Sequence, residues 1–415
     1  MTYLGEFRRS WTNLLGACIG MATGASLSFY TMSLFGPALI EDLGWTKADF
    51  ALVSSLPLVT FVLHPMIGHF IDRVGPRIAV GTGFAGVILS FLGLSQMTSL
   101  WQYLAINALF GFFGLMTSSM ALSRVIVDRF DAARGVGLAL LTSASPLSGA
   151  LAAPLLSPIV SEYGWRAGYL VLALISAIGG LLAISLIGRS PEPAADAAAG
   201  KHEPPKLNRA ELMRIVRNPV FGVLMGAMFL VNIPGAFASS QLVLVTMEQG
   251  ISRADAVWMV SLFATGVIGG RWICGIALDR LPAHWVAAVA FGAPVLSYAA
   301  FASGTATTPV LIAAILLIGL AQGAEGDVGA FILSRRFETR NFSLVYSILN
   351  MMVASGSAIG ALILSYLLRL QDSYHSFIVL CLGAELVGAV MWWMTGFIRY
   401  ERKPDPAAQA AEAVP

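Results

Sequence analysis

The sequence predicts an all-α membrane protein with twelve transmembrane helices in two six-helix halves related by pseudo-two-fold symmetry. Of its 415 residues, 57% are hydrophobic and only 12% are charged. The mean hydropathy is +0.77, and these values together exclude a soluble globular domain of this length. The apolar runs are continuous over about 20 residues, which indicates helices because the strands of membrane barrels alternate in polarity. The 42 glycines fall largely within these runs, where small residues let membrane helices approach closely.

Charged and turn residues divide the chain into twelve apolar runs. The predicted spans are 12–38, 48–71, 78–98, 102–127, 136–160, 167–188, 219–246, 254–278, 285–304, 309–334, 342–368 and 375–398. Prolines predict kinks in the first span at Pro37, in the seventh at Pro234, and in the fifth, which has three prolines. We therefore expect an N-terminal bundle over 1–188, a linker over 189–218, a C-terminal bundle over 219–398 and a tail over 399–415.

The placement of Lys and Arg predicts the orientation in the membrane. These residues gather on one side of the predicted spans, together with the linker, whose second part, NRAELMRIVRN, has an amphipathic helical pattern. The short connections of the other side have only Lys47, Arg166, Arg253 and Arg369. Since the side rich in Lys and Arg is cytoplasmic, we expect both termini in the cytoplasm and a multi-pass protein of a bacterial inner membrane.

The two halves repeat each other with an offset of 207 residues. The offset relates these pairs: Gly68 and Gly275, Asp72 and Asp279, Arg73 and Arg280, and Gly149 and Gly356. An internal duplication is the simplest explanation, because several matches share one register. In duplicated transporters the binding site lies between the halves near the membrane midplane.

Arg271 is a charged residue inside the apolar run of the eighth span. It precedes Asp279, where the run meets water, by eight residues, which places it about 12 Å into the membrane. An apolar layer is about 30 Å thick, so Arg271 lies near its middle. Charges at this depth are costly, and they mark a substrate path or a buried ion pair.

The tenth span supplies carboxyl groups at a similar depth. Asp327 precedes Arg335 by eight residues, and Glu325 lies slightly deeper. Burial disfavours the charged form of a carboxyl and a nearby arginine opposes this effect, so both are candidate proton carriers. The alternative is a static pair in which Asp327 only neutralises Arg271. His64 occupies the position of Arg271 in the first repeat, with either a titrating or a packing role.

Further polar residues lie within apolar spans and are candidates for lining a substrate cavity. They are Ser26 and Tyr30 in the first span, Asn232 and Gln241 in the seventh, and Asn350 in the eleventh. The alternative is that each satisfies the backbone of a kinked helix. Glu385 in the last span has no partner that the sequence indicates, and we assign it no role at this stage.

The end of the second span carries a loop motif, GHFIDRVGPR over residues 68–77. It resembles the loop signature GxxxDRxGRR of the major facilitator superfamily, and residues 275–284 form a degenerate second copy. The resemblance implies a cytoplasmic latch that breaks and reforms as access to the cavity alternates. The latch residues are Gly68, Asp72, Arg73, Arg77, Asp279 and Arg280. The alternative is that the arginines only set the orientation in the membrane.

Three features resemble the monocarboxylate and oxalate–formate branch of this superfamily. They are LGWT over 43–46 with Asp49, GWR over 164–166, and Arg271 four residues before Gly275. The resemblance implies that Arg271 binds a substrate carboxylate, for which a planar, permanently charged guanidinium is suited. The chain departs from the branch in having Val267 where animal carriers have an aspartate. It also lacks their first-span lysine, near Tyr30, and the eleventh-span lysine of oxalate carriers, so we expect one carboxylate on the substrate.

We therefore expect a secondary transporter that moves a small organic anion, a monocarboxylate, by alternating access together with a proton. A first alternative is a proton-driven multidrug or metabolite exporter of the same fold, favoured by the loose proline–glycine pattern SPLSG over 145–149. A second alternative is a membrane sensor that does not transport.

Other functions are not indicated. The sequence has neither a Walker-type loop nor a nucleophile–base spacing, so we expect no enzyme activity and no cofactor. We expect no metal, because Cys18, Cys274 and Cys381 lie in apolar runs without CxxC spacing. The net charge of +2 is too small to indicate nucleic acid. The expected partners are the substrate anion, a proton and the lipid bilayer, with the monomer as the functional unit.

Overall fold

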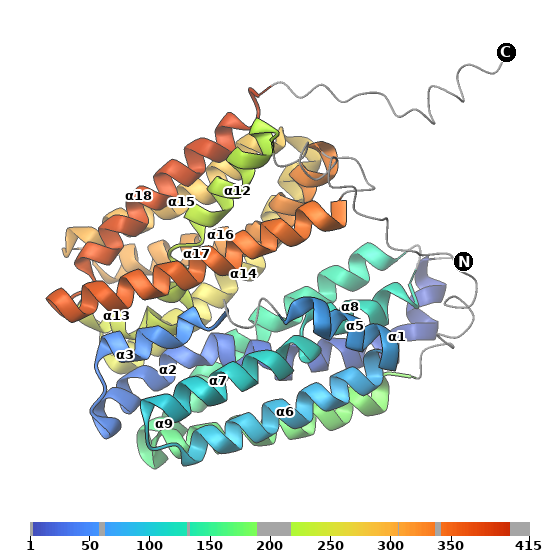
Figure 1. Cartoon of the computed structure of the whole chain (residues 1–415), viewed down its shortest axis with the longest axis horizontal. Coiled ribbons are helices and arrows are strands. Elements are labelled where there is room, and N and C mark those ends of the chain that lie inside the picture. Colours follow the sequence, from blue (N-terminus) through green and yellow to red (C-terminus); the bar gives the residue numbers. More distant parts are fainter. Residues whose placement is uncertain are drawn as a thin grey trace.

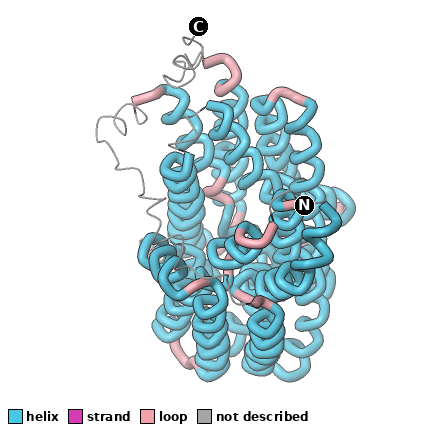
Figure 2. The backbone as a smooth tube through the Cα atoms, turned by 90° about the vertical axis from the view of Figure 1, so that its right-hand side faces the viewer, coloured by secondary structure: helices cyan, strands magenta, loops and turns pink. Residues whose placement is uncertain are grey.

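The computed structural model describes residues 3–57, 63–130, 133–188, 217–305, 307–336 and 342–398. Every regular element in these residues is a helix (Figures 1 and 2). The all-α fold is therefore as predicted. The helices before and after the linker form two groups (Figure 1).

The first group contains the first six predicted spans. Its elements are α1 (Tyr3–Thr23), α2 (Ala25–Leu43), α3 (Lys47–Ala51), η1 (Leu52–Ser55), α5 (His64–Val74), α6 (Pro76–Gln96), α7 (Leu100–Gly114), η2 (Leu115–Thr117), α8 (Ser119–Val127) and α9 (Arg134–Leu186). The long α9 holds the fifth and sixth spans, because the chain reverses at Gly164, where φ is 82°. A positive φ strains any residue with a Cβ, which explains the glycine.

The second group contains the other six spans. Its elements are α12 (Pro219–Val231), the π-helix η3 (Phe237–Gln241), α13 (Leu242–Glu248), α14 (Arg253–Arg280), α15 (Ala283–Ser303), α16 (Thr308–Arg336), α17 (Phe342–Gln371) and α18 (His375–Met394). In the described residues, nine helical segments are long and apolar enough to cross a membrane, and one of them, Gly135–Leu186, holds two spans. The second span, whose middle lies outside the described residues, and the broken seventh span bring the total to twelve.

The first and seventh spans break at positions that the repeat relates. The first breaks at Gly24, between α1 and α2, and not at Pro37, which lies inside α2. Gly24 sits against Thr117, whose hydroxyl accepts a hydrogen bond from the Ala25 amide at 3.0 Å. The seventh span breaks after Val231, and its broken turn includes Pro234, which has no N–H to continue a helix.

Helices α14 and α16 pack backbone against backbone along four glycines, which we call the glycine seam. Its members are Gly266 and Gly270 of α14, and Gly319 and Gly323 of α16. A Cβ at any of them would overlap backbone atoms of the facing helix. Each helix thus presents a small-xxx-small pair, a spacing that permits the closest approach of membrane helices.

Replacing a seam glycine should separate α14 from α16. We expect Gly270→Ala to destabilise the protein by about 1–3 kcal/mol, because its methyl group overlaps the Leu320 carbonyl and main chain cannot move aside locally. The measurement is thermal unfolding of the purified protein in detergent. The neighbouring variant Gly269→Ala is the control, since no described atom lies within 4 Å of its added Cβ. Equal stability of the two variants would show that the seam does not hold the helices.

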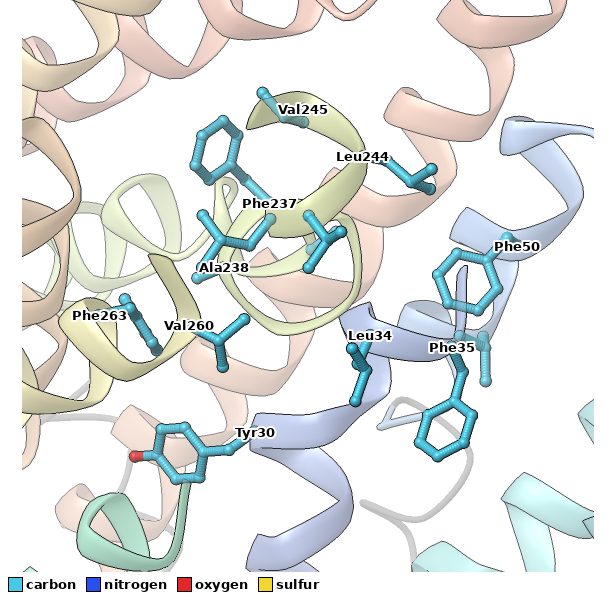
Figure 3. Close-up of a cluster of buried hydrophobic side chains, with 14 of the residues drawn as sticks. Tyr30, Leu34, Phe35, Phe50, Phe237, Ala238, Leu244, Val245, Val260 and Phe263 are labelled. Carbon is cyan, nitrogen blue, oxygen red and sulfur yellow. The ribbon is translucent and has the colours of Figure 1, made fainter. Parts of the chain in front are cut away.

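The apolar cores show where the two halves meet. One buried cluster combines residues of both halves, such as Leu34 and Phe50 with Phe237 and Phe263 (Figure 3). The other two clusters each draw on one half alone. The halves therefore share a hydrophobic core at one end of the molecule and keep separate cores at the end where α1 begins and α18 ends (Figure 1).

Candidate functional site

A cavity of about 350 Å³ lies between the two halves. Its lining combines helices α1, α2, η2, α9, α14 and α16 with the Ser118 position between η2 and α8. The lining residues are Met21, Ala25, Ser26, Phe29, Tyr30, Thr117, Ser118 and Ser145 of the first half, and Val267, Arg271 and Gln322 of the second. We call it the central cavity. Its position between the repeats is where the duplication predicts a binding site.

Arg271 is the cationic group of the central cavity. Its Nε lies 3.6 Å from Oδ2 of Asp327, which is an ion pair at a distance too long for a normal hydrogen bond. Within the described part of the chain, neither its Nε nor its Nη1 has a hydrogen-bond partner, although both atoms are buried. Buried donors without acceptors are costly, so the central cavity has two arginine donors to which an acceptor could bind.

The two carboxyl groups of α16 have different surroundings. Asp327 faces Arg271, and its side chain is 45% exposed. Glu325 is buried and accepts hydrogen bonds from Asn232 Nδ2 at 2.9 Å and from Gln322 Nε2. Only Asp327 thus pairs with Arg271, while Glu325 is held by two neutral amides.

The predicted lining residues divide into two groups. Ser26 and Tyr30 line the central cavity, where the Ser26 hydroxyl donates to the Met21 carbonyl and the Tyr30 ring packs against Gly149. Asn232 is buried away from this cavity, beside Glu325.

The structure places the other predicted residues elsewhere. Gln241 is fully buried and accepts a hydrogen bond from the Tyr374 hydroxyl at 2.6 Å. Asn350 is exposed and donates to the Tyr346 carbonyl at 2.9 Å, and His64 begins α5. None of these three lines the central cavity.

Several cavity residues were not predicted from the sequence. Gln322 and Ser145 line the cavity, as do Thr117 and Ser118 at the break between η2 and α8. The signal in the sequence is the polar run Thr117-Ser118-Ser119 inside an apolar span. The repeat offset of 207 residues relates Ser118 to Glu325, so each half has a polar residue at this position of the repeat.

Polar contacts join the halves at the end that has the shared core, which we call the closed face. Lys47 Nζ pairs with Glu248 at 3.3 Å, and Arg369 pairs with Asp49 at 3.2 Å. The Ser54 hydroxyl donates to Ser240 at 2.8 Å. These contacts link α3 and η1 of the first half to the second half, and they hold this end shut.

The segments LGWT (43–46) and GWR (164–166) lie at the closed face. Thr46 caps α3 reciprocally with Asp49, which positions Asp49 to accept from Arg369. Near the reversal of α9, Trp165 and Arg166 both donate to the Asp42 carboxylate, at 2.8 and 2.9 Å. The hydrogen bonds of these two segments thus fix the arrangement of the chain at the closed face.

Tyr374 is a buried tyrosine of the closed face. Burial holds the pKa of its hydroxyl well above its usual range, so the hydroxyl remains a donor to Gln241. Tyr374 therefore connects the start of α18 to the end of η3 at any physiological pH.

The predicted latch residues lie at the end opposite the closed face, where the two halves keep separate cores. No described atom lies within 4 Å of a Cβ placed at Gly68 or Gly275. Arg73, Asp279 and Arg280 are exposed, and within the described residues these three and Arg77 form no ion pair. The side chain of Asp72 lies outside what the structure describes. The latch therefore stays a prediction, which applies to a conformation in which the two halves meet at this end.

Charge reversal at the closed face should open it. We expect Lys47→Glu to shift the molecule toward separation at this face, because the new carboxylate repels Glu248 and Asp372. Exposed ion pairs contribute up to about 1 kcal/mol each, so the loss of both Lys47 pairs should lower the ratio of closed to open molecules by up to roughly 30-fold. Distances between spin labels on α3 and α17 measure this ratio. The control is Arg166→Glu, whose partner Asp42 belongs to the same half; an equal response would contradict the assignment.

Comparison with known proteins agrees with this architecture. Residues 17–325 and 224–415 match the model of the Major Facilitator Superfamily. The chain belongs to the Major Facilitator Superfamily. It is accordingly a multi-pass membrane protein with the fold of that superfamily, and the predicted family is confirmed.

Two curated relatives within the superfamily illustrate its range. The membrane sensor protein UhpC of Salmonella typhimurium is 27% identical over 282 residues, covering 62% of this chain and 62% of that protein. Monocarboxylate transporter 4 of Gallus gallus is 26% identical over 427 residues, covering 97% of this chain and 86% of that protein. The two names differ in function, so they do not identify a substrate.

Solved structures of superfamily members support the fold. The nucleoside transporter NupG matches with a TM-score of 0.72 and 14% identity, over 93% of this chain and 100% of that one. A bacterial homologue of the human lysosomal transporter Spinster, in an inward-facing and unoccupied conformation, matches with a TM-score of 0.72 and 15% identity, over 94% and 97%. At such identities the likeness shows the fold alone.

Proposed function

We propose that this protein is a secondary transporter that moves a small organic anion, a monocarboxylate, across the membrane by alternating access together with a proton. The observation that carries the proposal is Arg271, which lines a cavity between the halves and has two buried nitrogens, Nε and Nη1, without hydrogen-bond partners among the described residues. No bond chemistry, cofactor or metal is part of the proposal.

The chemistry of the central cavity suits a small carboxylate. A guanidinium can hold both oxygens of a carboxylate in a bidentate arrangement. The first half contributes Ser26 and Tyr30 to the lining, and Phe29 and Val267 add apolar surface for a short carbon chain. The cavity lining contains one cation, which favours one carboxylate over two.

The likeness to a monocarboxylate transporter along nearly the whole chain supports this substrate class. The motifs LGWT and GWR add a second line of support, since their residues form hydrogen bonds that order the closed face of this chain. The likeness to a membrane sensor covers a smaller part of the chain, so we place transport first.

A proton enters the proposal through Asp327. A substrate anion that takes the donors of Arg271 competes with Asp327 for the same charge. The displaced carboxylate then lies in the membrane interior without its cation, where desolvation favours protonation. Substrate and proton thus bind together, which is the requirement for symport.

The distribution of Lys and Arg supports an orientation of the protein in the membrane. If the end rich in Lys and Arg lies in the cytoplasm of a bacterial inner membrane, the closed face lies outside. The structure then corresponds to an inward-facing state, and the predicted latch residues meet when the cavity opens outward. One chain supplies both walls of the cavity, so a monomer suffices.

Replacement of the Arg271 guanidinium tests the substrate proposal. In proteoliposomes with an inward proton gradient, we expect Arg271→Gln to reduce uptake of labelled monocarboxylates by about 100-fold, which corresponds to hydrogen bonds worth about 3 kcal/mol to a charged group. Arg271→Lys should retain part of the uptake, because it keeps the charge but lacks the fork. Arg166→Gln, a closed-face arginine paired within one half, is the control. Full uptake by Arg271→Gln would refute the carboxylate site.

Neutralisation of the acidic partner tests proton coupling. We expect Asp327→Asn to remove the stimulation of uptake by a proton gradient, while exchange of labelled for unlabelled substrate continues at equal pH on both sides. The physical reason is that an amide cannot take the proton that a displaced carboxylate takes. Uptake at several external pH values measures the effect. An unchanged pH dependence would leave Asp327 as a static neutralising group only.

A second candidate is a proton-driven exporter of the same fold. It is favoured by the proline–glycine segment of residues 145–149, because Ser145 lines the central cavity and Gly149 contacts Tyr30. An exporter protects cells against lipophilic compounds, whereas a monocarboxylate carrier does not. Binding of a carboxylate without counterflow in vesicles would instead indicate a sensor.

A further inference from the structure

A second, smaller cavity lies inside the second half, next to the central cavity. It has a volume of about 30 Å³ and is lined by residues of the broken seventh span, α15, α16 and α18. We call it the side cavity. A water molecule needs about 10–15 Å³ by this measure, so the side cavity has room for about two.

Two buried carboxyl groups line the side cavity. They are Glu325 of α16, which is 8% exposed, and Glu385 of α18, which is 4% exposed. In the described residues, Oε2 of Glu385 has no hydrogen-bond partner although it is buried. An ionised carboxylate without a partner in a membrane helix is very costly, so this oxygen carries a proton or contacts cavity water.

The hydrogen bonds of Glu325 give it the opposite character. One oxygen accepts from Asn232 and the other from Gln322. The amide orientation of Asn232 is set independently, because its Nδ2 also donates to the Met228 carbonyl at 2.9 Å, and a carbonyl only accepts. Two donors on a carboxyl favour its charged form, whereas its burial favours the neutral form. The structure therefore shows one carboxyl with two amide donors and one with an unpartnered oxygen, around a common cavity.

Gln322 joins the side cavity to the substrate site. Its side chain lines both cavities and donates to Glu325. The other titratable groups that act on Glu385 are Tyr298 of α15 and Cys381 of its own helix. Neither is a cation, so nothing described beside Glu385 holds it as a carboxylate.

We propose that Glu385 and Glu325 form a proton-storing pair, which exchanges one proton through water in the side cavity and communicates with the Arg271 site through Gln322. Glu385 holds the proton while Glu325 is charged. When Gln322 leaves Glu325 to bind a substrate in the central cavity, Glu325 loses one of its donors and takes the proton from Glu385, whose carboxylate is then hydrated by the water of the side cavity. The link to substrate rests on the proposed function, but the proton-storing pair itself does not.

The pair is tested without any substrate. Infrared titration of the purified full chain follows the C=O stretch of protonated carboxyls, and we expect two coupled steps from this pair. Glu385→Gln should remove one band and move the titration of Glu325 by about tenfold in proton concentration, as coupled sites do. Glu325→Gln should remove the other band and change the titration of Glu385 in turn. Glu162→Gln, an exposed carboxyl of the first half, is the control.

The possible results separate this proposal from the proposed function. If Glu385→Gln leaves the titration of Glu325 unchanged, the two carboxyls do not share a proton and the pair is refuted. If Glu385 fills a structural role only, the isosteric Gln reproduces the wild-type spectrum apart from its own band. A carboxylate uptake that depends on Arg271 would stand in either case. Coupled titrations in a protein without carboxylate uptake would instead support the pair and refute the transport proposal.

Discussion

The close approach of α14 and α16 is the contact on which the candidate site depends. Four glycines let the two helices meet through their backbones, and this short separation brings Arg271 of α14 to Asp327 of α16. Residues with a Cβ in the seam would move the helices apart and leave the guanidinium without its partner. A charge in the membrane interior is tolerated when a counter-charge lies nearby, so the seam and the ion pair support each other.

A second constraint is that the halves meet strongly at one end only. The shared core and the closed-face ion pairs join them there, while the central cavity lies between them. Each exposed ion pair contributes little, so the closed face can separate at modest cost once its apolar contacts do. This balance is what a protein needs if it is to open on either side in turn.

The polar groups of the second half form one connected arrangement. Asp327 pairs with Arg271 of the central cavity, Glu325 and Glu385 line the side cavity, and Gln322 lines both cavities. The repeat explains part of this, since the breaks in the first and seventh spans occupy related positions. The first half uses a hydroxyl, Thr117, at its break, whereas the second half uses an amide and a carboxyl. The two copies have therefore diverged toward packing in one half and ionisable chemistry in the other.

The sequence by itself determined the membrane class, the twelve spans, the two repeated halves and the place of Arg271 inside an apolar span. These depend on hydropathy and spacing, which are properties of short segments. Only the tertiary structure decided which polar groups meet. Glu325 and Asp327 are two residues apart, so they point about 200° apart around α16, and helix packing selects which one reaches Arg271. The same reason explains why Gln241 and Asn350 lie outside the central cavity, and why Glu385 lines the same side cavity as Glu325.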